Sequence, residues 1–231
     1  MVHEPPETSF ETALAGLLRM RADGDMTSPA ETVIDLYQRH AASYDRRRGK
    51  TLHEEAWLAR FRRHLAPNAA ILDIGCGTGQ PIASYFRAQG HAVTGVDSAP
   101  AMIALCRARF PEGEWQVADM RRLAVGRRFG GLIAWDSAFH LTPEDQRGMF
   151  QVFAAHAAPD AALMFTSGPA HGEAIGSFEG EALYHGSLDH GEYRALLAEN
   201  GFAVIDHVVE DPSCGGHTIW LAQAAPAQGA L

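Results

Sequence analysis

The chain has 231 residues and 46% of them are hydrophobic, which is enough for one α/β domain with its own core. Its net charge of −9 disfavours nucleic acid or an anionic membrane as the main partner. Three scattered cysteines, no signal-peptide pattern and no apolar run of membrane-spanning length together predict a cytoplasmic protein without a disulfide framework.

The first part of the chain predicts helices that precede any sheet. Residues 8–22 carry apolar side chains on one helical face. Residues 28–31 combine a serine cap, a first-turn proline and a glutamate, which is a capping box, and predict a helix that runs towards Tyr44. A further helix carries Trp57 and ends at Pro67-Asn68.

A strand, a glycine turn and a helix follow. Residues 70–74 form a short apolar run, which is typical of a buried parallel strand. The run ends in Gly75, Gly77 and Gly79, and glycines at a turn let a ligand approach the backbone closely. Residues 82–88 then predict a helix. This order is the first unit of a doubly wound, nucleotide-binding sheet.

Two acids stand at the ends of the next two predicted strands. Asp97 ends the strand over 92–97, and its carboxylate can accept hydrogen bonds from both hydroxyls of a ribose. Its alternative role is to cap the following helix. Asp119 follows the third strand, which begins at Glu114, and its alternative role is an acidic turn.

The second half of the chain predicts four more strands and one insertion. The fourth strand covers 129–136 and the fifth 163–168, and strands over 202–209 and 217–222 close the sheet as a hairpin. Residues 169–190 are rich in glycine and histidine and poor in aliphatic residues, so they are predicted to be a long loop that acts as a substrate lid.

The glycine turn has a specific form. Residues 72–79 read Leu-Asp-Ile-Gly-Cys-Gly-Thr-Gly, which is G-x-G-x-G and not the G-x-G-x-x-G of dinucleotide sites. This segment resembles the first motif of the class I S-adenosylmethionine (SAM)-dependent methyltransferases, and the resemblance extends over about residues 37–223. It implies a seven-stranded, mostly parallel, doubly wound sheet with an antiparallel C-terminal hairpin and N-terminal helices that cap the cleft.

The resemblance also implies a division of the chain and a cofactor. Residues 1–66 are expected to form the helical cap, 67–224 the SAM-binding core with its lid at 169–190, and 225–231 a flexible tail. SAM is the expected cofactor, with Asp97 on its ribose, Asp119 on its adenine and Asp73 near its amino group. The residues assigned to the cofactor are Tyr44, Asp73, Gly75, Cys76, Gly77, Gly79, Asp97, Ser98, Asp119, Met120 and Trp135.

The expected reaction is methyl transfer to an oxygen, nitrogen or sulfur of a small molecule by in-line displacement. Such an acceptor must lose a proton, and histidine suits that task near neutral pH. His140 is the first choice because it lies just past the fourth strand; for each histidine, surface or packing is the alternative. The predicted catalytic residues are His140, Tyr184 and His185, and the predicted substrate-binding residues are Asp136, His140, Tyr184, His185 and His217.

Several other interpretations stay open. A non-catalytic SAM-binding protein and, less favoured, an NAD-dependent oxidoreductase are the alternative functions. Cys214 and His217 have the C-x-x-H spacing of zinc ligands, but there is no second cysteine pair, so no metal is expected. The expected partner is a small-molecule methyl acceptor, without nucleic acid or membrane, and the chain is expected to be a monomer or a homodimer.

Overall fold

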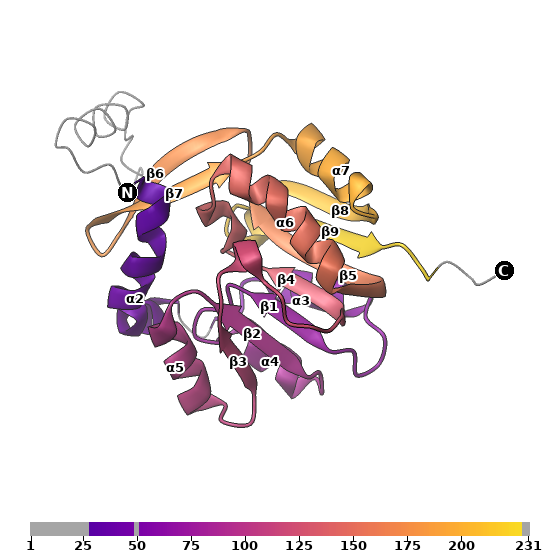
Figure 1. Cartoon of the computed structure of the whole chain (residues 1–231), viewed down its shortest axis with the longest axis horizontal. Helices are drawn as coiled ribbons and strands as arrows, with labels where there is room; N and C mark the ends of the chain where they lie inside the picture. The colour runs from indigo at the N-terminus through magenta and orange to yellow at the C-terminus, as the bar shows by residue number, and fades with distance from the viewer. Residues whose placement is uncertain (1–27, 49–50, 228–231) are drawn as a thin grey trace.

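The computed structural model describes residues 28–48 and 51–227, so the helix predicted over 8–22 lies outside the described residues. Seven strands form the main sheet in the order β3-β2-β1-β4-β5-β9-β8 (Figure 1). Their bounds are β1 Ile71–Ile74, β2 Val93–Asp97, β3 Glu114–Val117, β4 Phe129–Ala134, β5 Ala157–Ser167, β8 Phe202–Asp211 and β9 His217–Ala224.

Strand directions confirm the predicted fold class. Strands β3, β2, β1, β4 and β5 pair in parallel, and all but the exposed edge strand β3 are largely buried. Strand β9 runs antiparallel to both β5 and β8. The sheet is therefore mostly parallel and closes with an antiparallel C-terminal hairpin.

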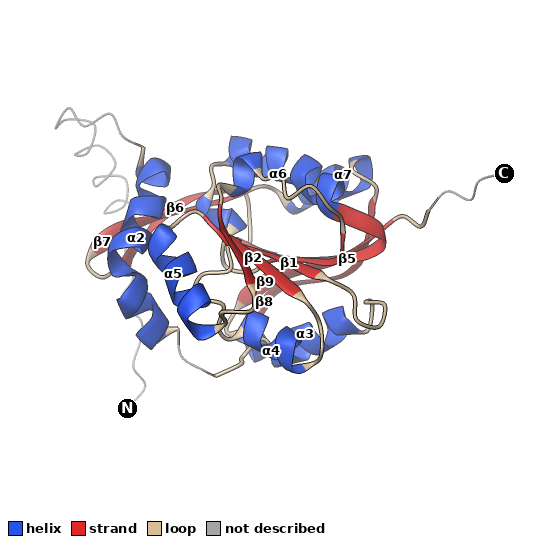
Figure 2. Cartoon of the chain, turned by 60° about the horizontal axis from the view of Figure 1, so that its bottom comes forward, coloured by secondary structure: helices blue, strands red, loops and turns tan. Residues whose placement is uncertain are grey.

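Helices cover both faces of the sheet (Figure 2). The helices α3 (Glu55–Arg62), α4 (Ile82–Ala88) and α5 (Pro100–Arg109) bury apolar side chains against one face. The helices α6 (Pro143–His156) and α7 (His190–Glu199) do so against the other. Helix α3 ends at Arg62, before the predicted end at Pro67, and turns continue the chain from there.

The helix α2 (Pro29–Arg47) begins with the predicted capping box. The Ser28 hydroxyl accepts a hydrogen bond from the Ala30 N–H, and the Glu31 carboxylate accepts one from the Ser28 N–H. Helix α2 lies beside α5 and under the strands β6 and β7 (Figure 1). Its buried Leu36 packs against Leu183 of β7, so α2 and these strands form one wall.

Residues 169–190 are not a loop, as the sequence predicted, but mostly an antiparallel hairpin. Strands β6 (Gly172–Phe178) and β7 (Glu181–Ser187) form a second, two-stranded sheet. Glu179 and Gly180 connect them with φ angles of 52° and 82°, and two positive φ angles suit the twist of a tight hairpin.

The order of strands reverses between β1 and β4, which is where ligands bind in doubly wound sheets. The turn after β1 and the segment after β4 meet there: the Ser137 hydroxyl donates to the Ile74 carbonyl at 2.7 Å. Among the described residues, no helix is long and apolar enough to cross a membrane.

Candidate active site

The glycine turn after β1 leaves no room for side chains. Gly75 and Gly77 have φ angles of 76° and 54°, a region that suits glycine. A Cβ on Gly75 would lie 2.3 Å from the Ser137 Cβ, and one on Gly77 would lie 3.2 Å from the Tyr44 ring. The turn is therefore a bare backbone cradle between α2 and the end of β4.

Asp97 holds this cradle in place and also faces a cavity. One carboxylate oxygen accepts the Gly77 N–H at 3.0 Å, and the other accepts the Ala99 N–H at 2.9 Å. The second bond holds the residue just before α5, while the ribose role of Asp97 stays a prediction. Burial raises the pKa of Asp97 to about 6.

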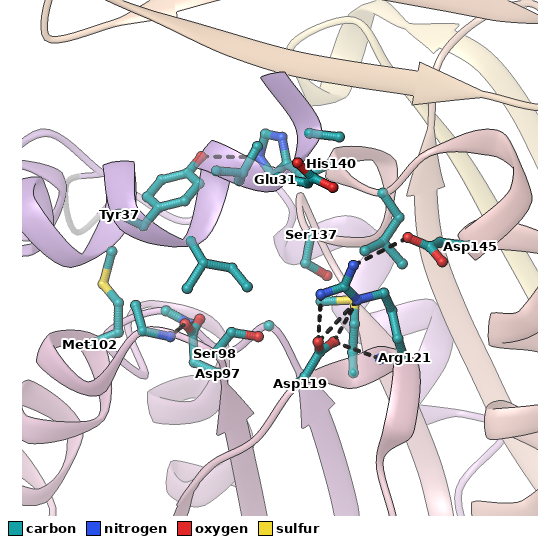
Figure 3. Close-up of a pocket in the computed structure, with 18 of the residues that line it drawn as sticks. Glu31, Tyr37, Asp97, Ser98, Met102, Asp119, Arg121, Ser137, His140 and Asp145 are labelled. Carbon is teal, nitrogen blue, oxygen red and sulfur yellow. Dashed lines mark hydrogen bonds and ion pairs between the residues drawn. The ribbon is translucent and has the colours of Figure 1, made fainter. Parts of the chain in front are cut away.

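The first cavity, of about 220 Å³, lies between α2 and the carboxyl ends of β1, β2 and β3 (Figure 3). The residues in its wall that were predicted to bind the cofactor are Tyr44, Gly75, Gly77, Asp97, Ser98, Asp119 and Met120. Figure 3 shows Asp97 and Ser98 on one side and Asp119 on another, with Tyr37 above them on α2.

The other four predicted cofactor residues are not in that wall. Asp73 lies buried in β1, where burial and then the Asp97 charge raise its pKa to about 7. Cys76 is buried in the core. A Cβ on Gly79 would face Trp115, away from the cavity. Trp135 is also buried, and its ring packs on His217 with centroids 5.5 Å apart.

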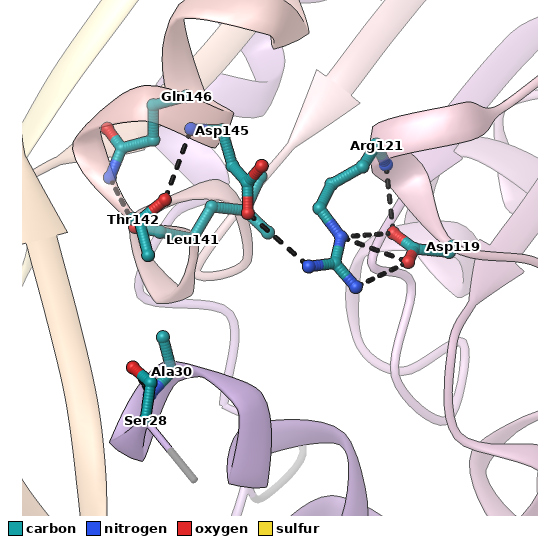
Figure 4. Close-up of polar contacts among 8 residues, drawn as sticks. All are labelled: Ser28, Ala30, Asp119, Arg121, Leu141, Thr142, Asp145 and Gln146. Atoms are coloured by element: carbon teal, nitrogen blue, oxygen red, sulfur yellow. Dashed lines mark hydrogen bonds and ion pairs between the residues drawn. The ribbon is translucent and has the colours of Figure 1, made fainter. Parts of the chain in front are cut away.

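Arg121 lines the first cavity, and Figure 4 shows its guanidinium between the carboxylates of Asp119 and Asp145. Its guanidinium donates to both oxygens of Asp119, at 2.6 Å for the closest pair, and to Asp145 at 3.3 Å. Burial opposes the effect, but these bonds leave the pKa of Asp119 below its usual range. The sequence did not single out Arg121, although it stands two residues past Asp119.

A second cavity of about 620 Å³ lies under the β6–β7 hairpin. Its wall includes Glu173, His185 and His217, together with the Gly215-Gly216 turn. It shares four wall residues with the first cavity: Tyr37, Tyr44, Asp136 and His140. Tyr37 and Tyr44 are seven residues apart on α2, two helical turns, so one helix face presents both rings to this junction.

His140 is held at the junction by two hydrogen bonds. Its Nδ1–H donates to the Tyr184 carbonyl at 2.8 Å, so its Nε2 accepts from the Tyr37 hydroxyl at 3.0 Å. Burial lowers the pKa of His140 to about 4. The imidazole is therefore neutral near pH 7, and its one lone pair is already accepting a hydrogen bond.

Asp136 and His217 are in contact at the same junction. The His217 Nδ1–H donates to the Cys214 carbonyl at 2.6 Å, and its Nε2 lies 3.0 Å and 3.2 Å from the two oxygens of Asp136. The hydrogen bond with Asp136 raises the pKa of His217. Asp136 itself has a φ of 48°, a strained value that is typical of functional sites.

The side chains of the two remaining predicted residues, His185 and Tyr184, lie in different places. His185 lines the second cavity, its ring lies 5.0 Å from that of His140, and burial lowers its pKa. The ring of Tyr184 is buried with Val33 and Leu36, and Tyr184 is in the wall of neither cavity. Tyr184 contacts His140 through its carbonyl.

In the C-x-x-H pair, the His217 ring meets the Cys214 backbone. His217 bonds the carbonyl of Cys214, not its sulfur, and burial raises the pKa of the Cys214 thiol to about 11. Among residues 28–48 and 51–227, no three His, Cys, Asp or Glu side chains are grouped to hold a metal ion.

Known proteins resemble this chain over its core. Residues 71–160 match the family model of a methyltransferase domain. The chain is 33% identical over 121 residues to the dTDP-3-amino-3,6-dideoxy-α-D-glucopyranose N,N-dimethyltransferase of Streptomyces fradiae, which covers 51% of this chain and 47% of that protein. It is 30% identical over 137 residues to the dTDP-4-amino-2,3,4,6-tetradeoxy-D-glucose N,N-dimethyltransferase of Saccharopolyspora spinosa, covering 56% and 55%. The matched part thus spans about half the length of these curated relatives.

A solved structure resembles this chain over most of its length. The SAM-bound amino pentose methyltransferase of Micromonospora echinaspora has a TM-score of 0.64 and 24% identity, covering 80% of this chain and 96% of that one. Residues 71–160, which include the glycine cradle, thus match a methyltransferase domain, and the sheet order agrees with the Rossmann-like fold of the SAM-bound structure.

Proposed function

We propose that the chain transfers a methyl group from SAM to an amino nitrogen of a small molecule. The observation that carries this proposal is the shared wall between the two cavities. Tyr37, Tyr44, Asp136 and His140 border both, so a cofactor in the first cavity meets an acceptor in the second there. A carboxylate at this junction suits a cationic methyl donor and a protonated amine.

The residues of the first cavity fit the cofactor. Bound SAM supplies a methyl group on a sulfonium, whose sulfur is the leaving group. The bare backbone at Gly75 and Gly77 leaves space for a ligand that a Cβ would fill. Asp97 keeps oxygen lone pairs for the ribose hydroxyls, and the Asp73 carboxyl below the turn favours the donor's positive charge.

The second cavity fits a compact acceptor. Its volume of about 620 Å³ lies in the range of small-molecule sites. The β6–β7 hairpin and α2 form part of its wall, through Gly172, His185 and Tyr37. Two relatives and one structural neighbour are named for amino sugars, which supports a nitrogen acceptor. Substrate roles are proposed for Asp136, His140, His185 and His217, and a positioning role through its carbonyl for Tyr184.

Two measurements test the function. Calorimetry should show binding of SAM and of S-adenosylhomocysteine, but not of NAD. Radiolabelled methyl transfer should then be measured with dTDP-3-amino-3,6-dideoxyglucose, with free amino sugars and with the matching hydroxy sugars. We expect label on the amines alone. Binding without turnover on any of them would indicate a non-catalytic SAM-binding protein, and binding of NAD in place of SAM an oxidoreductase.

A further inference from the structure

We infer that the Asp136–His217 pair, and not His140, accepts the proton that the acceptor amine loses before methyl transfer. This inference rests on the proposed function and assigns the base of that reaction. Three observations carry it: the fixed orientation of His217, its hydrogen bonds to Asp136, and the occupied lone pair of His140.

The loop before β9 fixes the orientation of the His217 ring. Asp211 accepts the Gly216 N–H on its carbonyl at 2.8 Å, and Gly215 and Gly216 have φ angles of 64° and 77°. This turn places the Cys214 carbonyl 2.6 Å from His217 Nδ1, which therefore carries a hydrogen. Trp135 packs on the ring and holds its plane. Only Nε2 is left to exchange a proton.

Asp136, the partner of His217 Nε2, lies at the junction of the two cavities, where the acceptor amine is expected. Both oxygens of Asp136 are within 3.2 Å of Nε2, and Asp136 borders both cavities. Its backbone N–H donates to the Thr166 hydroxyl at 2.8 Å, which anchors the residue on β5. The carboxylate can thus accept a hydrogen bond from an ammonium, and from Nε2–H once His217 has taken the proton.

His140 is poorly suited to the same task. Its Nδ1–H is used by the Tyr184 carbonyl, and its Nε2 already accepts from Tyr37. Burial lowers its pKa to about 4, far from the pH at which a general base works best. The pKa of His217 is instead raised above its usual value near 6.5.

The proton balance is simple. An N–H bond of the ammonium breaks and leaves its electron pair on nitrogen, and the proton passes by way of the Asp136 carboxylate to Nε2 of neutral His217. The freed lone pair attacks the methyl carbon, and the electrons of the broken C–S bond stay on sulfur. His217, a third exposed in the second cavity, then returns the proton to solvent.

Other groups surround the pair and shape its titration. Those that line the cavities or act on it by charge are Tyr37, Tyr44, Arg48, Glu54, His140, Glu173 and His185. Because only neutral His217 can accept the proton, the rate is expected to rise with pH as His217 deprotonates. The acidic limb of the kcat profile should therefore lie above pH 6.5.

The test compares His217→Asn with a matched control. The Asn side-chain N–H can replace Nδ1–H as the donor to the Cys214 carbonyl, but Asn cannot take a proton from Asp136. The control is His207→Asn, because His207 also bonds a backbone carbonyl through Nδ1, stacks on a tryptophan, and lines neither cavity. With dTDP-3-amino-3,6-dideoxyglucose at pH 7, we expect His217→Asn to lower kcat about 100-fold and to remove the acidic limb. SAM affinity and the control's profile should be unchanged.

A second readout does not depend on turnover. Titration of the His217 ring by NMR should give a pKa above 6.5 that falls in Asp136→Asn. An acidic limb retained in His217→Asn, or a His217 pKa unmoved in Asp136→Asn, overturns the inference. Absence of amine methylation by the unmodified protein is a different result, because it overturns the proposed function itself.

Discussion

At the scale of single residues, Gly77 is the tightest point of the cradle that faces α2. Its φ of 54° favours glycine, and the absence of a side chain leaves the space between the turn and the Tyr44 ring. Two different costs would follow from a substitution there: strained backbone, which affects stability, and lost space, which affects binding. Substitution of a second glycine that has a positive φ but open space around it would strain the backbone without affecting binding, so it can distinguish the two effects.

We therefore expect Gly77→Ala to weaken SAM binding at least about tenfold, which is about 1.4 kcal/mol. The added Cβ would lie 3.2 Å from Tyr44 and push apart the two sides of the cavity. Gly126→Ala is the control, because Gly126 has a φ of 76° and a Cβ added there would meet nothing within 4 Å. Calorimetry should show unchanged SAM affinity in Gly126→Ala. Equal affinity in the two variants would contradict the role of close approach.

The position of a residue at the end of a strand can be predicted from the sequence. The role of a residue that depends on its hydrogen-bond partners cannot. Asp97 and Asp119 stand in the first cavity because each ends or follows a short strand. The roles of His140 and His217 could not be separated that way, since their protonation depends on which carbonyl and which acid each ring meets. Only the folded chain brings Asp136 and His217, 81 positions apart, into contact.

At the scale of elements, the unforeseen feature is the β6–β7 hairpin. Its sequence has glycines and histidines where a strand usually alternates β-branched residues, so a loop was predicted. Tertiary contacts compensate: Leu183 packs on α2, and Glu181 bonds His40 of that helix at 2.5 Å. The capping box of α2, by contrast, could be predicted, because its hydrogen bonds join residues only two and three apart.

The junction between α2 and α3 depends on a buried ion pair. Arg48, which follows α2, bonds Glu54, which precedes α3, at 2.5 Å; their side chains are 18% and 2% exposed. Removing one charge would leave the other buried without a partner. We expect Glu54→Gln to lower the free energy of unfolding by about 3 kcal/mol.

The matched comparison is Asp206→Asn, which removes the partner of Arg60 in a pair with side chains 47% and 37% exposed. Exposed pairs contribute little, so a loss below about 1 kcal/mol is expected. Urea unfolding of the three proteins measures both values. Since Arg48 also lines the second cavity, Glu54→Gln should raise the KM for the acceptor as well. Similar stability losses in the two variants would contradict the importance of burial.

At the scale of the whole molecule, buried acids and buried histidines act on stability in opposite directions. Burial raises the pKa of Asp73 to about 7, so the folded state holds this proton more tightly than the unfolded state. Its contribution to stability therefore falls as pH rises from about 4 to 7. Burial lowers the pKa of His140 to about 4, so its contribution falls instead as pH drops below about 6.5. The two effects partly cancel between pH 4 and 6.5.

Asp73→Asn separates these contributions, because asparagine resembles the protonated carboxyl and does not titrate. The unfolding free energy of the variant, minus that of the unmodified protein, should increase by more than about 1 kcal/mol between pH 4.5 and 7.5, since one pKa unit corresponds to 1.36 kcal/mol. Urea unfolding without ligand at several pH values measures it, and an unchanged m-value would show that both proteins unfold from equally compact states. Parallel curves would mean that Asp73 is ionised in the fold at all these values. In that case the Asp73 carboxylate would already carry its charge, and SAM binding to the unmodified protein would release no proton near neutral pH. If instead the pKa of Asp73 is about 7, SAM binding should release a proton, and calorimetry in buffers of different ionisation enthalpy should detect it.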